Sequence, residues 1–576
     1  MPKSLPRLPN LQPLVLNKGS LLPLGIACGS GILMALAAAP LNAFPLAWIA
    51  LAPLWVLVFG DRHPSLPSPS NPYLLALIWG IGYHGLALSW ITGLHPLTWL
   101  GMSWLASVAV ALFCWAFITL WGAMLVVIWV WLVRKLAGAS RRQTSKDRQE
   151  GNSKLKTHPS LHPIPPPPTY PSAPFPPYAF ILITTALWCS LEWVWSLGSL
   201  YWTSLSFTQS PGNLAILHLG QLSGPSMVTA AIVAVNGLIA EAWILHQYSP
   251  PTSYPPPPPP STLLLSSLTL LLTLHLIGYA LYSQPLNPSS ETALKVGIVQ
   301  GNVPTRIKLS AEGVRRAVKG YVSGYELLAR QGVEAVLTPE GALPVLWDEN
   351  YKQQNLFYQA VKSQGVVAWL GTFVAQHGRI TQSLITLTGQ GETFSRYNKI
   401  KLVPLGEYVP FREVLGGLIN RLSPVEADML AGTGAQRFDT PFGRAIASIC
   451  YESAFPELFR AQAADGGQFI LTASNLDPYS EVLMAQHQAQ DLMRAIEMDR
   501  WVVRATNTGY SGIIDPHGRI LWRSQPKAYE THAETIYRRQ RQTFYVQWGD
   551  WLTPLLVGLA AIAWFFFPEV ETQLNQ

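Results

Sequence analysis

Charged residues are scarce in this chain. Asp, Glu, Lys and Arg make up only 12% of its 576 residues, whereas about 25% is usual for a soluble protein. Hydrophobic residues reach 49%. A soluble enzyme of ordinary composition is therefore excluded, and a protein with several membrane spans is favoured.

Cysteine is scarce as well. The chain has 4 cysteines, of which Cys28, Cys114 and Cys189 lie in hydrophobic stretches of the first half. Cys450 alone lies in the polar second half, at the end of an apolar run. It has no partner there for an intramolecular disulfide, so it is either a small core residue or a nucleophile.

The sequence also lacks the patterns of several binding functions. The net charge is +7, but no basic stripe interleaved with aromatic residues is present, so no nucleic acid partner is expected. No cluster of metal ligands and no nucleotide-binding loop occurs, so neither a metal nor another cofactor is expected. Basic cytoplasmic loops of a membrane protein explain the positive charge better.

Long apolar runs dominate the first half. A membrane span needs about 20 predominantly apolar residues. Eight runs qualify: Leu21–Ala39, Ala43–Gly60, Tyr73–Thr92, Leu97–Val133, Tyr178–Leu197, Ser223–Leu245, Leu263–Tyr282 and Trp551–Phe567. The run Leu97–Val133 is long enough for one tilted span or for a span with an interfacial turn.

Loop charges predict the orientation of these spans. Lysines and arginines are concentrated at residues 134–156, after the fourth run, and near the N-terminus at Lys3, Arg7 and Lys18. With eight spans, both regions lie on one face, and short basic loops usually face the cytoplasm. We therefore expect both termini in the cytoplasm and the polar domain on the extracytoplasmic side.

The composition divides the chain into three parts. Residues 1–290 form a predicted bundle of seven transmembrane helices, residues 291–545 a polar domain, and residues 546–576 a last helix with a tail. The Pro-rich tracts Pro165–Pro168 and Pro255–Pro260 fall in the predicted cytoplasmic loops, where such tracts are extended linkers.

Short apolar runs alternate with helical patterns in the polar domain. Strands are expected at 293–299, 333–337, 366–373, 445–450 and 469–473, and helices at 315–331, 356–364, 485–500 and from about 456. This alternation predicts an α/β domain, in which active sites gather where strands end.

Three polar residues lie at or near such ends: Glu340, Lys399 and Cys450. Each alone is typical of an ordinary turn, surface or core residue. Together they suit acyl transfer through a thioester, because a carboxylate can take the thiol proton and an ammonium can stabilise a thiolate and an oxyanion. A helix starting near Pro456 is expected to lower the pKa of the thiol.

The segments around these residues resemble a known family. Gln300-Gly301-Asn302, Pro339 to Pro344, Tyr397-Asn398-Lys399 with Gly406 to Pro410, Cys450-Tyr451-Glu452, and Arg494-Ala495-Ile496-Glu497 with Arg504 to Gly509 are similar to segments of the apolipoprotein N-acyltransferase family, in the nitrilase (carbon-nitrogen hydrolase) superfamily. The resemblance covers nearly the whole chain. It implies a polytopic α-helical membrane protein of about eight transmembrane helices with an inserted α-β-β-α sandwich domain.

The resemblance also implies roles for individual residues. Glu340 is expected to be the base, Lys399 the oxyanion stabiliser and Cys450 the nucleophile. Lys399 is preferred over Lys401 because it follows Tyr-Asn, as the lysine of the family does.

Further residues match the family pattern less directly. Glu407 matches a further essential acidic position, and Tyr451 and Glu452 flank the nucleophile as supporting residues. One segment departs from the pattern: Ser474 to Ser480 keeps Asn475 but alters the rest, which puts the shape of that loop in doubt.

The reaction implied by the resemblance is a two-step acyl transfer. A membrane phospholipid donates an acyl chain to Cys450, and the diacylglyceryl-modified N-terminal cysteine of an apolipoprotein then accepts it. This is the final step of lipoprotein maturation in the bacterial inner membrane, and the chain is expected to act there as a monomer.

The residues leave three other functions to consider. A membrane-anchored nitrilase-type amidase would use the same triad but release its acyl group to water. A transporter or scaffold would place clustered ionisable residues inside the spans, where only isolated ones such as Glu192 and Glu241 occur. A Cys-His protease is disfavoured because His487, His517 and His532 lie in no recognisable pairing context.

Overall fold

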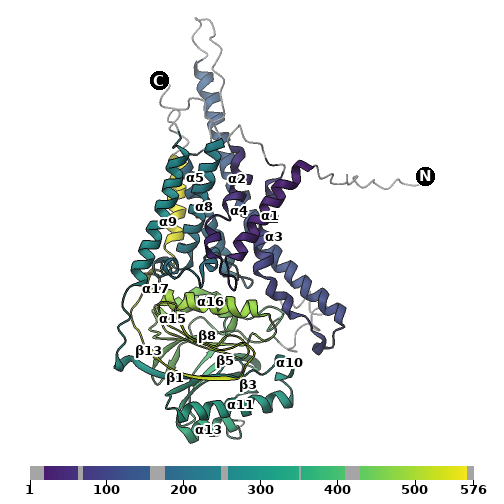
Figure 1. Cartoon of the computed structure of the whole chain (residues 1–576), viewed down its shortest axis with the longest axis vertical. Helices are drawn as coiled ribbons and strands as arrows, with labels where there is room; N and C mark the ends of the chain where they lie inside the picture. Colours follow the sequence, from purple (N-terminus) through teal and green to yellow (C-terminus); the bar gives the residue numbers. More distant parts are fainter. Residues whose placement is uncertain are drawn as a thin grey trace, which may run out of the picture.

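The structure is a computed structural model that describes residues 18–62, 69, 71–155, 175–247, 257–348, 352–408 and 428–566. A bundle of long helices lies at one end of an α/β domain (Figure 1). The Pro165–Pro168 tract, the first residues of the Pro255–Pro260 tract, and the basic residues Lys3 and Arg7 lie outside the described residues.

Each predicted span contains a helix of the bundle. The longer helices are α1 (Lys18–Leu36), α2 (Ala52–Phe59, preceded by the 3-10 helix η1, Phe44–Trp48, and followed directly by η2, Gly60–Arg62), α3 (Pro72–Ala87), α4 (Trp104–Leu155), α5 (Pro177–Leu197), α8 (Pro225–Gln247), α9 (Pro260–Tyr282) and α18 (Leu552–Phe566). Short helices connect them: η3 (Ser89–Leu94), η4 (Thr98–Leu100), η5 (Leu205–Gln209), α6 (Leu214–Leu217) and α7 (Gly220–Ser223).

The described residues contain 5 helical segments long and apolar enough to cross a membrane. They are Phe44–Arg62, Trp104–Gly138, Pro177–Leu197, Pro225–Gln247 and Pro260–Tyr282. The polytopic architecture is thereby confirmed. The other three predicted spans are shorter: α3 has 16 residues and α18 has 15, and the apolar part of α1 is Leu21–Leu36. At about 1.5 Å per residue they fall short of the roughly 30 Å hydrocarbon core.

The ambiguous fourth run is one span with a turn before it. Residues 97–103 form η4 and a turn, and α4 then begins at Trp104. Gly101 adopts a φ of 78° where η4 ends. This left-handed conformation suits glycine, which has no Cβ to clash, and it stops the helix before α4 starts.

Both intramembrane acids have structural partners. Glu192 accepts hydrogen bonds from Trp188, Ser204 and Thr229. Glu241 pairs with Arg62 in the interior of the bundle. Both carboxylates thus have polar partners within the bundle, and these contacts give no support to an ion pathway.

The α/β domain contains two sheets. The first has the strand order β13-β1-β2-β4-β5-β6, with β3 paired to β4, and the second has the order β12-β11-β10-β9-β8-β7. The strands are β1 (Ala293–Gln300), β2 (Ala335–Leu337), β3 (Leu343–Leu346), β4 (Val367–Gln376), β5 (Arg379–Leu387), β6 (Thr393–Asn398), β7 (Phe438–Thr440), β8 (Gly443–Ile449), β9 (Ile470–Ser474), β10 (Val502–Thr506), β11 (Gly512–Ile514), β12 (Ile520–Arg523) and β13 (Glu530–Tyr537).

Helices cover the outer face of each sheet, which gives the predicted α-β-β-α sandwich. They are α10 (Thr305–Lys308), α11 (Ala311–Arg330) and α13 (Leu356–Gln364) by the first sheet, and α15 (Pro456–Ala464), α16 (Glu481–Met498) and α17 (Phe544–Trp548) by the second; η6 (Ser290–Thr292) leads into β1. Alternate residues of the strands point to opposite faces, so Val296 packs between the sheets and Val299 packs under α11.

Helix α16 lies between the second sheet and the membrane bundle (Figure 1). Its Gln486 accepts a hydrogen bond from Trp202 of the α5–α8 connection and donates to the carbonyl oxygens of Ala39 and Ala87. The domain is therefore fixed to the loops at one end of the bundle.

The parallel strands bring several loops to one edge. Strands β1, β2 and β4 are parallel, and so are β8, β9 and β10. The carboxyl ends of parallel strands meet at the same edge of a sheet, where sites form in α/β proteins. Glu340 follows β2, Cys450 follows β8 and Asn475 follows β9.

Candidate active site

Cys450 lies in a strained turn directly after β8. Its φ is 53°, a left-handed value that is uncommon for a residue other than glycine. The short helix η7 (Cys450–Ala454) starts at this residue. The side chain is 8% exposed, and Sγ donates to the main-chain oxygen of Asn475 at 3.8 Å. Strained turns of this kind persist where the surrounding structure holds them, often at active sites.

Three buried residues hold this turn from the side of α16. His487 Nε2 lies 2.8 Å from the carbonyl oxygen of Cys450, and Arg504 Nη1 lies 2.7 Å from His487 Nδ1. Arg504 also pairs with Asp491. Because a guanidinium has only donors, His487 accepts at Nδ1 and donates from Nε2. It contacts the main chain of Cys450 and not the thiol, which argues against a Cys-His dyad.

Glu340 lies in the loop after β2, next to the segment that contacts Cys450. Its Oε2 accepts a hydrogen bond from the Asn475 N–H at 2.9 Å. The main-chain carbonyl oxygen of the same residue, Asn475, accepts a hydrogen bond from the Cys450 thiol. One peptide segment therefore aligns the carboxylate and the thiol.

Lys399 completes the set from the end of β6. Its Nζ donates to Glu340 Oε1 at 2.8 Å and to Glu407 Oε1 at 2.7 Å. Burial alone lowers the pKa of Lys399, but the carboxylates of Glu340 and Glu407 outweigh it and raise that pKa well above its ordinary value. Lys401 points elsewhere, since its Nζ lies 4.5 Å from the centre of the Phe455 ring.

The surroundings of the Cys450 thiol shift its pKa upward. Burial raises the pKa of Cys450, the charge of Glu340 raises it further, and Lys399 opposes both. Helix α15 begins at Pro456 as predicted, but the expected lowering of the thiol pKa is not found, because burial and the charge of Glu340 raise that pKa overall. A thiol of this kind needs a base at the moment of attack, and Glu340 is the carboxylate aligned with it.

The chain was compared with known proteins. Residues 30–238 match the apolipoprotein N-acyltransferase N-terminal domain, and residues 295–543 match the carbon-nitrogen hydrolase family. The chain is 53% identical over 535 residues to the apolipoprotein N-acyltransferase of Nostoc sp., an alignment that covers 92% of this chain and 97% of that one. This chain belongs to the apolipoprotein N-acyltransferase family.

Further relatives carry the same name. The Synechocystis sp. protein is 44% identical, with 94% of this chain and 100% of that one aligned. The Thermosynechococcus vestitus protein is 39% identical, with 94% of each chain aligned. The resemblance predicted from the sequence is confirmed over nearly the full chain.

Glu452 links the two halves of the site in this N-acyltransferase family member. Its Oε2 accepts from the Ile449 N–H at 2.7 Å and from the Tyr397 hydroxyl at 3.1 Å. Its Oε1 accepts from the N–H groups of Ile400 and Lys401 at 2.6 and 3.2 Å. The end of β8 is thereby tied to the segment after Lys399. Burial raises the pKa of Glu452 to about 7, against the effect of these donors.

Tyr451 connects the turn at Cys450 to the membrane bundle. Its hydroxyl donates to the carbonyl oxygens of Ser199 and Tyr201 at 2.8 and 3.0 Å. Its ring stacks on Trp202 with 6.1 Å between ring centres. All three partners lie in the connection between α5 and η5, so the residue after Cys450 is held by the membrane part of the chain.

The sequence pattern does not indicate the importance of several residues at this site. Asn475 is the one residue of its loop that matches the family pattern, and it contacts Glu340 and Cys450. His487 has no recognisable pairing context in the sequence, yet it holds the Cys450 carbonyl. Lys308 was not singled out, although its Nζ donates to the carbonyl oxygen of Glu340 at 3.0 Å.

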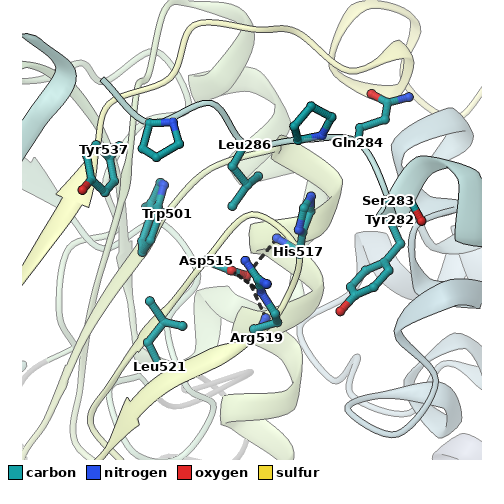
Figure 2. Close-up of a pocket in the computed structure, with 12 residues that line it drawn as sticks. Tyr282, Ser283, Gln284, Leu286, Trp501, Asp515, His517, Arg519, Leu521 and Tyr537 are labelled. Carbon is teal, nitrogen blue, oxygen red and sulfur yellow. Dashed lines mark hydrogen bonds and ion pairs between the residues drawn. The ribbon is translucent and has the colours of Figure 1, made fainter. Parts of the chain in front are cut away.

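A cavity of about 480 Å³ lies apart from these residues, where the end of α9 meets the second sheet. Figure 2 shows Trp501, Leu521 and Tyr537 on one side of it and Tyr282 on the other. None of the residues lining it is a predicted catalytic residue. Its acid Asp515 is already bonded to Arg519 at 2.6 Å.

Proposed function

We propose that this chain transfers an acyl group from a membrane phospholipid to the α-amino group of diacylglyceryl-modified apolipoproteins, by a two-step mechanism through a thioester on Cys450. Family membership supports the reaction class. The observation that carries the mechanism is the alignment of the Cys450 thiol and the Glu340 carboxylate on the main chain of Asn475.

In the first step, Glu340 takes the proton of the Cys450 thiol as sulfur attacks the ester carbonyl. The carbonyl oxygen becomes an oxyanion, which the Lys399 ammonium stabilises. Only two of the three donors of an ammonium are engaged by Glu340 and Glu407. The C–O bond then breaks, the departing alkoxide takes the proton from Glu340, and a lysophospholipid leaves.

In the second step, the α-amino group of the lipoprotein attacks the thioester. Glu340 takes a proton from the amine, and the C–S bond breaks to release the amide. The Cys450 thiolate recovers a proton from Glu340. Burial of the thiol supports this cycle, because a poorly hydrated site protects a thioester from water.

The membrane part explains how two lipid-anchored substrates meet. Contacts of Tyr451 and Gln486 with the bundle hold the site at the end of the membrane helices, where acyl ester and lipoprotein anchor are both concentrated. Restricting both substrates to this surface reduces the entropy cost of encounter.

We further propose the location and assembly of the protein. It is placed in the bacterial inner membrane with the catalytic domain outside and both termini in the cytoplasm, in agreement with the basic loop charges. The parts 1–290, 291–545 and 546–576 are taken as bundle, catalytic domain and last helix; the second boundary falls within α17 (Phe544–Trp548). A monomer is proposed because all the catalytic groups come from one chain.

The mechanism is tested by intact-mass measurement of the full chain in phospholipid vesicles without acceptor. One acyl adduct is expected, removed by hydroxylamine and absent in Cys450→Ala. Cys189→Ala serves as the matched control, because this cysteine is also buried but lies in α5. An adduct that persists in Cys450→Ala overturns the mechanism. Rapid loss of the adduct to water without acceptor supports the amidase alternative.

Orientation is tested separately with single cysteines at exposed positions. Glu392, the site of one cysteine, is in the catalytic domain, and Lys135, the site of the other, is near the proposed cytoplasmic end of the apolar span Trp104–Gly138. A membrane-impermeant maleimide added to spheroplasts is expected to label the first and spare the second. The reverse pattern refutes the proposed orientation.

A further inference from the structure

A second buried lysine lies at the catalytic loop. Lys308 ends α10 and is 8% exposed. Its Nζ donates one hydrogen bond, to the carbonyl oxygen of Glu340. An ammonium has three donors, and among the described residues no carboxylate forms an ion pair with it. Two donors of a buried cation therefore remain for a ligand beside the general base.

The titratable groups that act on Lys308 include Glu340 and Cys450, the two reacting groups. The charges that act on it come from Glu340 after β2, Asp477 after β9 and Cys450 after β8. Gly341, the residue after Glu340, has a φ of 54°, and a Cβ there would lie 3.2 Å from Lys308 Nζ. The glycine thus leaves room for the ammonium next to the catalytic loop.

The altered loop after β9 holds Lys308 in place. Asp477 Oδ2 accepts from the Thr305 N–H at 2.5 Å, at the start of α10. Asn475 Nδ2 donates to Thr305 Oγ1 at 3.3 Å. Asn475 also contacts Glu340 and Cys450. One loop therefore contacts both the two reacting groups and the helical turn that carries Lys308.

The site has more acidic than basic side chains around Lys399, so a second cation would improve its charge balance. Glu340 and Glu407 share the single ammonium of Lys399, which makes this cluster net negative when both acids are ionised. Attack by Cys450 adds a developing oxyanion to the same space. A second positive group with free donors would stabilise that charge where Lys399 is already engaged by two carboxylates.

We propose that Lys308 is a second catalytic lysine, which donates a hydrogen bond to the oxyanion formed when Cys450 attacks the acyl ester. This inference rests on the proposed thioester mechanism. It gives the loop Ser474 to Ser480 a catalytic purpose, because that loop positions Lys308 through Thr305.

The role has a pH signature. Burial lowers the pKa of Lys308 to about 8, although the charges of Glu340, Asp477 and Cys450 raise it. The ammonium is charged below that pH and loses its charge as the pH rises through it. Acylation is therefore expected to slow about tenfold for each pH unit above about 8. Arginine stays charged throughout this range, so Lys308→Arg should move the decline to higher pH.

The test measures the rate of acyl adduct formation on the full chain in phospholipid vesicles, from pH 6 to 10. Acceptor is omitted, so that its own amine does not titrate. At pH 7 we expect Lys308→Met to be slower by roughly 100- to 1,000-fold, the usual effect of removing one oxyanion donor. Thermal unfolding of each variant shows whether it folds.

Lys295→Met is the matched control. This lysine, on β1, also donates to a main-chain carbonyl, that of Gln331, but far from the reacting groups, and its removal should leave the rate unchanged. A folded Lys308→Met within threefold of the wild-type rate overturns the inference, as does a decline near pH 8 that persists unchanged in Lys308→Arg. Failure of the wild type to form any adduct would instead refute the proposed function.

Discussion

The buried pair Asp491–Arg504 offers the sharpest test of how the turn at Cys450 is held. Both side chains are fully buried. Arg504 also donates a hydrogen bond to His487, which in turn donates to the Cys450 carbonyl oxygen. Asp491→Asn keeps the shape of the side chain and removes its charge. The guanidinium of Arg504 is then left in the interior without a counter-charge.

The size of the effect follows from this burial. Removing one partner of a buried ion pair costs about 3–5 kcal/mol, because the other charge remains desolvated. For a domain of this size, each kcal/mol lowers the melting temperature by about 2–4 °C. Asp491→Asn should therefore melt roughly 6–20 °C below the wild type.

The assay is thermal unfolding of the full chain in detergent, followed by tryptophan fluorescence at one fixed heating rate, because unfolding of such a protein is rarely reversible. Glu481→Gln is the control on the same helix, since the Glu481–Lys527 pair is more than half exposed on both sides. Its cost should stay within about 1 kcal/mol.

A double variant tests whether the uncompensated charge causes the loss of stability. Adding Arg504→Met to Asp491→Asn removes the uncompensated charge, so the double variant should recover part of the lost stability. The acyl adduct on Cys450 should form more slowly in Asp491→Asn, because the turn of the nucleophile loses its support. If Asp491→Asn melts within 2 °C of the wild type and acylates at the same rate, the pair does not hold the turn.

Two further variants probe the neighbours of the nucleophile. Glu407→Gln leaves Lys399 with one carboxylate and should slow adduct formation by roughly 10- to 100-fold. This range corresponds to the loss of one hydrogen bond to a charged group, which contributes about 1.5–3 kcal/mol. An unchanged single-turnover rate would count against a role for Glu407. Tyr451→Phe loses the hydrogen bonds to Ser199 and Tyr201 but keeps the ring, so acyl transfer from vesicles should fall severalfold while alkylation of the thiol by iodoacetamide stays the same. Equal losses in both assays would show a general disturbance of the site.

Elements with a strong apolar pattern were predicted well from the sequence. The helix predicted at 356–364 matches α13, and the strand at 293–299 matches β1 apart from its last residue. Strand β13 was not predicted, because its sequence ETHAETIY has little apolar alternation. It forms through eight residue pairs with β1, a contact between segments more than 200 residues apart.

The residues predicted for the site were found through motifs, and the structure brings Glu340, Lys399 and Glu407 into one hydrogen-bonded cluster. The network behind Cys450 could not be predicted in this way. In the sequence, α16 has the polar face of a surface helix, with His487 and Asp491 on it. That face is buried because the helix lies between the sheet and the bundle.

The sequence by itself determined that this chain is a membrane protein with an α/β domain, and it supplied the residues on which a thioester mechanism can be based. Those conclusions depend on local composition, periodicity and motifs. The tertiary structure alone decided that burial raises the pKa of the thiol, that His487 holds the main chain, and that Lys308 lies beside Glu340. Burial and charge at a site are set by neighbours distant in the sequence, and only the folded chain brings them together.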